Sequence, residues 1–279
     1  MRKIDLNNWT LFSDRKNSKN YVSLDGRKLL KASSDVKTFK LEELEDELFI
    51  ANVAYDMGIK TPRPGIVVEM PDGTPALVTD YVQNKKSFSR YISEHPESME
   101  EMMKLFAREA KVFHNVSANK GLVRSFKDAM VESLDASPIY NDEEKKIILD
   151  KISRLPSGDT ILHGDFQPSN ILLSGDEVYW IDLSMMTYGN PLFDIAFLWF
   201  VTVKSNERVY DRVFHTNAEG AYRMWEVFAR EYFETENVSA VEELIRPYAF
   251  AGINLILKVM PNTGFITYNK EEILKECMK

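Results

Sequence analysis

Hydrophobic and polar residues alternate in short runs through the first eighty positions, a pattern that predicts a small β-sheet. Residues 21–24 and 28–31 have the composition of strands and flank Asp25-Gly26, a pair that is typical of the turn in a β-hairpin. Residues 66–68 and 76–82 predict two more strands, joined by a turn. The beginning of the chain is therefore expected to form an antiparallel sheet.

One helix is predicted within this sheet-forming region. From Leu41 onward, the apolar positions follow the spacing of three or four residues that places side chains on one helical face: Leu44, Leu48, Ala51 and Tyr55. Gly58 and the prolines that follow it predict the end of the helix. We expect a small sheet that carries a single main helix.

The pattern becomes mainly helical after residue 84. Helices are predicted at residues 99–114, 124–134 and 142–155, short strands at 160–162, 171–173 and 178–183, and further helices from residue 192 onward. With a hinge near residues 80–84, these elements predict an α+β, bilobal body. Its small N-lobe comprises residues 1–84, and its larger, mainly helical C-lobe comprises residues 85–279.

Composition limits the classes of partner and compartment. Of the 279 residues, 44% are hydrophobic and 28% are charged, which is ordinary for a globular protein. The formal net charge of -8 argues against binding to a nucleic-acid backbone. The longest apolar run, residues 195–201, is too short to cross a membrane, and Cys277 is the single cysteine. We expect a cytoplasmic protein that binds neither nucleic acid nor membrane.

The most informative segment is His163-Gly164-Asp165, followed by Asn170 five residues after the aspartate and by Asp182 twelve residues later. This spacing is similar to that of kinase loops, in which one aspartate handles the acceptor hydroxyl and a later asparagine and aspartate hold magnesium. Mg²⁺ prefers oxygen ligands, which Asn170 and Asp182 offer. Asp165 is then the catalytic candidate. A solvated turn followed by a strand-end aspartate is the structural alternative.

At this point the sequence resembles the superfamily of aminoglycoside phosphotransferases, choline kinases and related small-molecule kinases. The resemblance is carried by the His-Gly-Asp segment with its later Asn and Ile-Asp, and by three further segments: residues 58–64, Phe113-His114 and residues 190–196. It implies a protein-kinase-like fold and transfer of the γ-phosphoryl group of ATP or GTP, with Mg²⁺, to a hydroxyl of a small molecule. An aminoglycoside or an amino alcohol is among the implied acceptors.

The resemblance also implies roles for residues outside the catalytic segment. Lys31 would contact the nucleotide phosphates and Glu47 would be its ionic partner, although Lys28 is a rival lysine and Glu47 lies in a run of acidic residues. Tyr81 and Val82 at the hinge are expected to contribute to nucleotide binding.

Three further residues have expected supporting roles. His163 is expected to brace the catalytic loop, and Asp194 is expected to accept hydrogen bonds from that loop. His114, on an apolar helix face, is interpreted as a packed core histidine.

Some features depart from the pattern and leave alternatives open. Residues 1–25 contain no glycine, so the turn between Phe12 and Tyr21 is not a glycine-rich phosphate loop. A nucleotide-binding pseudokinase is therefore one alternative. A protein Ser/Thr kinase is a weaker one, because Gly164 stands in place of the arginine of its His-Arg-Asp signature and only twelve steps separate Asp182 from Asp194.

Overall fold

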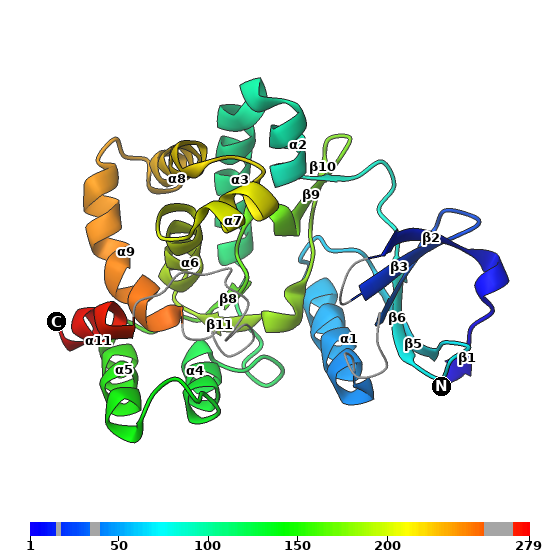
Figure 1. Ribbon diagram of the computed structural model, residues 1–279, viewed down its shortest axis with the longest axis horizontal. Helices are drawn as coiled ribbons and strands as arrows, with labels where there is room; N and C mark the ends of the chain where they lie inside the picture. The colour runs from blue at the N-terminus through cyan, green and yellow to red at the C-terminus, as the bar shows by residue number, and fades with distance from the viewer. Residues whose placement is uncertain (15–17, 34–39, 254–269) are drawn as a thin grey trace. The chain divides into compact units, whose positions relative to one another are not determined.

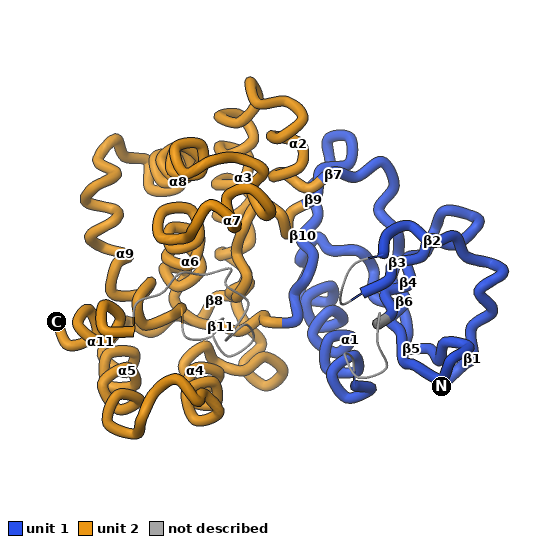
Figure 2. The backbone as a smooth tube through the Cα atoms, viewed as in Figure 1, with its two compact units in different colours: residues 1–86, 172–184 blue, residues 87–171, 185–279 orange. Residues whose placement is uncertain are grey.

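The structure is a computed structural model in which residues 1–14, 18–33, 40–253 and 270–279 are described. The chain divides into two compact units (Figure 2). Unit 1 contains residues 1–86 and 172–184, and unit 2 contains residues 87–171 and 185–279. The functional division of the chain near residue 84 stays a prediction.

Unit 1 is built on a six-stranded sheet in the order β1-β5-β6-β4-β3-β2 (Figure 1). The strands are β1 (Arg2–Lys3), β2 (Trp9–Asp14), β3 (Ser18–Ser23), β4 (Lys28–Ser33), β5 (Pro64–Glu69) and β6 (Pro75–Asp80), with the 3-10 turn η1 (Leu6–Asn8) after β1. β1 pairs in parallel with β5, and the other neighbouring strands are antiparallel. The predicted Asp25-Gly26 turn joins β3 to β4, with Gly26 in the left-handed region at φ +69°.

Strand β4 shows how the two-residue period of a strand positions a functional candidate. Leu30 and Ala32 are buried in an apolar cluster that also contains Val68 and Ala76. Because successive side chains of a strand point to opposite faces, Lys31 points away from this cluster. The cluster therefore fixes the register that presents Lys31 on the other face of the sheet.

Helix α1 (Leu41–Asp56) packs against β5 and β6 and buries Leu44, Val53 and Ala54. It ends where the sequence predicts, because Gly58 adopts the left-handed conformation at φ +83°. After the helix, the backbone N–H of Trp180 donates to the carbonyl of Lys60, which ties a hairpin to unit 1. This hairpin consists of β9 (Ile171–Ser174) and β10 (Glu177–Trp180).

The predicted strand at residues 178–183 is longer than the one observed, since β10 ends at Trp180. Asp182 has a left-handed backbone with φ +60°, which is incompatible with a continuing strand. Residues Leu183–Met185 then form the 3-10 turn η4.

Unit 2 is mainly helical. Its helices are α2 (Phe88–Glu94), α3 (Met99–His114), α4 (Phe126–Asp135), α5 (Asp142–Arg154), α6 (Leu192–Val203), α7 (Glu207–Val209), α8 (Ala218–Phe233), α9 (Val238–Gly252) and α11 (Lys270–Met278). Shorter elements are η2 (Pro96–Ser98), η3 (Pro168–Asn170) and the π-helical turn η5 (Tyr210–Phe214). The strands are β8 (Thr160–Leu162) and β11 (Thr187–Gly189), which pair antiparallel, and β7 (Lys86–Ser87) at the unit boundary.

Helix α6 lies at the centre of unit 2 and packs against α8 and α9 (Figure 1). It is apolar on almost all sides, as expected for a helix surrounded by other elements. Asp194 in its first turn is the single charged residue of the helix and is buried. A charge at this position needs compensating partners within the fold.

The α+β fold class predicted from the sequence is confirmed: an antiparallel-rich sheet with one main helix lies in the N-terminal part, and helices dominate the C-terminal part. The predicted helix at residues 99–114 coincides with α3. Over the described residues, the structure has no helix with the length and apolar character needed to span a membrane.

Candidate active site

The His163-Gly164-Asp165 segment follows β8 in unit 2 and owes its conformation to its glycine. Gly164 has φ +84°, and a Cβ atom at this position would lie 2.4 Å from the carbonyl oxygen of Met185. Any other residue would therefore be strained both in its backbone and by this contact. The glycine of the motif is required by the local packing of the loop.

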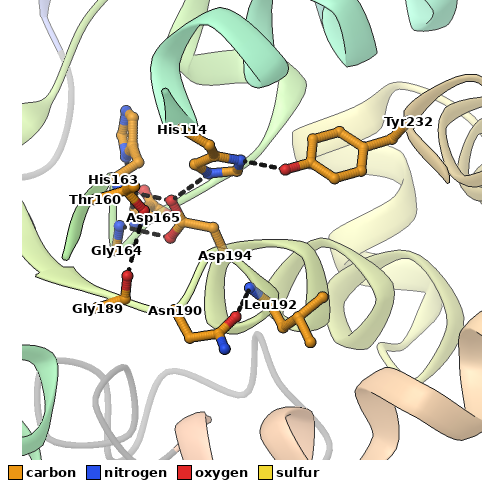
Figure 3. Close-up of polar contacts among 10 residues, drawn as sticks. All are labelled: His114, Thr160, His163, Gly164, Asp165, Gly189, Asn190, Leu192, Asp194 and Tyr232. Atoms are coloured by element: carbon orange, nitrogen blue, oxygen red, sulfur yellow. Dashed lines mark hydrogen bonds and ion pairs between the residues drawn. The ribbon is translucent and has the colours of Figure 1, made fainter. Parts of the chain in front are cut away.

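Asp194 holds the backbone of this segment from helix α6 (Figure 3). Its Oδ2 atom accepts a hydrogen bond from the His163 backbone N–H at 2.6 Å, and its Oδ1 atom accepts one from the Gly164 N–H at 3.0 Å. His114 contacts the same carboxylate, with 3.2 Å between Nε2 and Oδ2. The buried carboxylate thus joins α3, α6 and the loop.

The side chain of Asp165 is oriented by two amides from the same loop. Its Oδ1 accepts from Gln167 Nε2 at 2.8 Å, and its Oδ2 accepts from Asn170 Nδ2 at 2.8 Å. The Asn170 amide nitrogen also donates to the Asp165 carbonyl at 2.9 Å. These contacts fix the half-buried carboxylate of Asp165 at the start of the turn that carries Asn170.

The same contacts bear on whether Asn170 suits a metal ion. Because an ionised carboxylate only accepts hydrogen bonds, the NH₂ group of Asn170 must face Asp165. The Asn170 amide oxygen consequently points away from that carboxylate and is an uncharged oxygen ligand of the kind that Mg²⁺ accepts. His163, with its side chain buried, accepts at Nδ1 from the Asp165 N–H at 3.3 Å.

Unit 1 brings together Lys31 and Glu47, the predicted phosphate-binding lysine and its ionic partner. Lys31 Nζ on β4 lies 2.8 Å from Glu47 Oε1 on α1. Burial lowers the pKa of Lys31, but the negative charges of Glu47 and Asp182 outweigh this effect and raise the pKa above its ordinary value. The lysine therefore carries a full positive charge near two carboxylates.

Asp182 is exposed and has an uncommon left-handed backbone for a residue other than glycine. It offers an oxygen ligand suited to a hard cation. Among the described residues there is no group of three or more His, Cys, Asp or Glu side chains that could hold a metal by themselves. Mg²⁺ in nucleotide sites takes one or two protein ligands and completes its shell with water and phosphate. The amide of Asn170 in unit 2 and the carboxylate of Asp182 in unit 1 each offer an oxygen of the kind that this ion accepts.

Residues 13–229 match the phosphotransferase enzyme family. The chain belongs to this family. A search of curated proteins found no match.

Solved structures of small-molecule kinases have a similar fold. A thermostable mutant of aminoglycoside phosphotransferase APH(4)-Ia has a TM-score of 0.61 and 14% identity, over 96% of this chain and 92% of that one. Amicoumacin kinase hAmiN, in complex with AMP-PNP, Ca²⁺ and Ami, has a TM-score of 0.57 and 13% identity, over 99% and 88%. Choline kinase LicA from Streptococcus pneumoniae has a TM-score of 0.56 and 12% identity, over 96% and 91%.

Membership of this family supports a small-molecule phosphotransferase activity. The glycine-free turn between Phe12 and Tyr21 is described only in part, because residues 15–17 lie outside the described residues. In the part that is described, Asn20 Nδ2 donates to Ser13 Oγ at 3.0 Å across the β2–β3 pair.

The hinge residues Tyr81 and Val82 line a cavity of about 320 Å³ in unit 1 of this family member, together with Arg63 and Tyr179. Tyr81 donates its backbone N–H to the carbonyl of Arg27 at 2.8 Å, so this amide is already used within the sheet. Neither Lys31 nor Glu47 lines the cavity. The nucleotide role of Tyr81 and Val82 stays a prediction.

Sequence reasoning did not find Tyr232. Its hydroxyl lies 2.9 Å from His114 Nδ1, so both ring nitrogens of His114 have polar partners. Tyr232 is 118 residues from His114 in the chain, and no spacing rule links them. The one available signal was that a tyrosine within a packed helical region usually finds a partner for its hydroxyl.

Substitution of the two candidate lysines distinguishes their roles in this phosphotransferase. Lys31→Met should reduce kcat/KM for nucleotide by about 10²-fold or more, because it removes a preorganised cation that Glu47 holds at 2.8 Å. Lys28→Met is the matched control, since Lys28 forms an exposed pair with Asp80. Steady-state kinetics with ATP and GTP measure both. Equal losses in the two variants would show that Lys31 has no special role.

Proposed function

We propose that this chain transfers the γ-phosphoryl group of ATP or GTP to a hydroxyl group of a small molecule in the presence of Mg²⁺. The proposal rests on the fixed orientation of the Asp165 side chain. Gln167 and Asn170 donate hydrogen bonds to its carboxylate, and Asp194 accepts hydrogen bonds from the backbone of the same loop. Phosphoryl transfer depends mainly on positioning and charge neutralisation, and a preorganised carboxylate meets the first requirement.

In this mechanism Asp165 orients the acceptor hydroxyl and accepts its proton as the acceptor oxygen bonds to the γ-phosphorus. The bond from the γ-phosphorus to the β–γ bridging oxygen breaks, and the nucleoside diphosphate leaves with that oxygen. Gln167 and Asn170 hold the carboxylate, so little reorganisation is needed when the acceptor binds. Bound Mg²⁺ would neutralise the charge that develops on the phosphate oxygens. Asn170 and Asp182 are the residues that would hold it.

Lys31 supplies a positive charge for the nucleotide phosphates. Its ion pair with Glu47 restrains the side chain, and the hydrogen bond at 2.8 Å fixes the direction of the ammonium group. Because the pKa of Lys31 is raised, the ammonium group stays charged at neutral pH.

For the acceptor, we propose a cavity of about 400 Å³ within unit 2. Helix α2 and the residues around the start of α8 line it, including Ile92 and Met224 as apolar walls. The same α2 and the turn η5 both contact η3, which carries Asn170. The volume lies in the range of small-molecule sites, and the cavity belongs to the unit that holds Asp165.

Charge at this cavity favours an acceptor with an amine. Arg223 lines the cavity but is engaged by Glu226 at 3.4 Å and by Glu100 at 3.7 Å. Glu219 also lines it, is exposed, and makes no ion pair with the described residues. Glu219 therefore offers a lining carboxylate to the amine of a cationic aminoglycoside or amino alcohol.

Two aspartate variants test the proposed chemistry. Asp165→Asn should lower kcat by about 10²–10⁴-fold while nucleotide–magnesium binding survives, because the residue acts on the acceptor hydroxyl. Asp182→Asn should weaken the magnesium-dependent binding of nucleotide, because a neutral amide is a poorer ligand for a hard dication. Nucleotide titrations at several Mg²⁺ concentrations, together with single-turnover assays, measure the two effects.

Asp176→Asn is the control for both variants, since Asp176 is exposed in the β9–β10 turn between Asn170 and Asp182. It should behave as the unmodified protein. A reversed pattern, in which Asp165→Asn abolishes metal–nucleotide binding and Asp182→Asn leaves it intact, would contradict the assigned roles. Nucleotide binding without turnover in the unmodified protein would instead indicate a pseudokinase.

The acceptor cavity has its own test. Glu219→Gln should raise the KM for amine-bearing acceptors by roughly two- to fivefold, as expected for the loss of one partly exposed charge interaction. The KM for nucleotide should not change. Choline and an aminoglycoside are the first acceptors to assay, and Glu243→Gln, an exposed position on α9, is the control. An unchanged acceptor KM in Glu219→Gln would show that the amine of the acceptor does not interact with Glu219.

A further inference from the structure

A chain of three buried or half-buried polar side chains runs from helix α8 to the catalytic loop (Figure 3). The hydroxyl of Tyr232 lies 2.9 Å from His114 Nδ1, and His114 Nε2 lies 3.2 Å from Asp194 Oδ2. The same Oδ2 atom accepts the backbone N–H of His163 at 2.6 Å. The outer helix α8 is thus linked to the loop by side chains from α3 and α6.

The direction of each hydrogen bond follows from the chemistry of the groups. An ionised Asp194 only accepts, which favours a neutral His114 with its proton on Nε2, and the Tyr232 contact at Nδ1 is the second contribution to that preference. His114 Nδ1 then carries the lone pair and accepts from the Tyr232 hydroxyl. Burial, together with the negative charge of Asp194, raises the pKa of Tyr232, so its hydroxyl remains protonated and able to donate.

The tautomer matters because the histidine is buried. The side chains of His114 and Asp194 are each 3% exposed, so water is not available to replace a missing partner. In the other neutral tautomer, a lone pair on Nε2 would face the Asp194 carboxylate. That arrangement is repulsive, and Asp194 Oδ2 would retain only the backbone N–H of His163 as a donor.

We propose that Tyr232 is a positioning residue, whose hydroxyl holds His114 in the Nε2-protonated tautomer and thereby keeps Asp194 directed at the amides of His163 and Gly164. Its effect on the loop is independent of the reaction. Its effect on turnover rests on the proposed function, because the loop that it orders carries Asp165.

Tyr232→Phe isolates the hydroxyl. The ring of Tyr232 stacks on Phe228, with 5.5 Å between centroids and 18° between planes, and a phenylalanine ring retains this contact. Tyr222→Phe is the matched control, because Tyr222 lies on the same helix α8 and is 40% exposed. The two substitutions remove the same atom, but Tyr222 does not contact His114.

The first measurement is the tautomer of His114, read from its two ring ¹⁵N shifts in a long-range ¹H–¹⁵N spectrum of the full chain. The protein has four histidines, and the His114→Gln variant identifies the signal. We expect an Nε2-protonated ring in the unmodified protein and in Tyr222→Phe. In Tyr232→Phe we expect a shift toward a mixture of tautomers and a displaced amide proton of Gly164.

The second measurement is turnover. Tyr232→Phe should lower kcat by about three- to tenfold, as expected for the loss of one hydrogen bond in a buried set, with the KM for nucleotide unchanged. A merely destabilising substitution would lower the thermal unfolding midpoint without changing the tautomer. Thermal unfolding of both Phe variants is therefore recorded alongside.

The outcomes separate this inference from the proposed function. If the His114 tautomer and the Gly164 amide are the same in Tyr232→Phe and in the unmodified protein, the positioning role is overturned whatever the kinetics show. If they change but kcat does not, the link to catalysis is overturned. If they change while the unmodified protein transfers no phosphoryl group, the proposed function fails and the positioning role stands.

Discussion

The carboxylate of Asp194 is the interaction on which the arrangement of unit 2 depends. It is buried in the first turn of an otherwise apolar helix, where an uncompensated charge would be strongly unfavourable. Two backbone amides of the catalytic loop and the ring of His114 compensate it. Removing one partner of such a set typically costs about 3–5 kcal/mol, so the stability of the native loop depends on helix α6.

This constraint explains why the His-Gly-Asp segment keeps its glycine. For the amides of residues 163 and 164 to reach one carboxylate, the chain must turn sharply with φ +84° at Gly164 and pass close to the carbonyl of Met185. The side chain of Asp165 then emerges where Gln167 and Asn170 can hold it. The contacts that the buried carboxylate of Asp194 requires therefore also determine the position of Asp165, the catalytic candidate.

Much of this could be predicted from the sequence, because local patterns carry it. Alternation around Leu30 and Ala32 predicts the strand and the direction of Lys31, and the periodicity of residues 99–114 predicts α3. The strand predicted at residues 178–183 was too long, because β10 ends at Trp180 and the left-handed backbone of Asp182 has no signal in the alternation of the strand. Tyr232 was not found, since its role depends on contact with a residue 118 positions away.

The direct test of the account is transfer of labelled phosphate by the purified, unmodified protein. With [γ-³²P]ATP or GTP, Mg²⁺ and a panel of amine-bearing alcohols, the label should appear on a small molecule and one nucleoside diphosphate should form for each phosphate transferred. A pool of Ser- and Thr-containing peptides serves as the competing acceptor. Label on peptides alone, or bound nucleotide with no transfer to any acceptor, would contradict the conclusion that this family member is a small-molecule kinase.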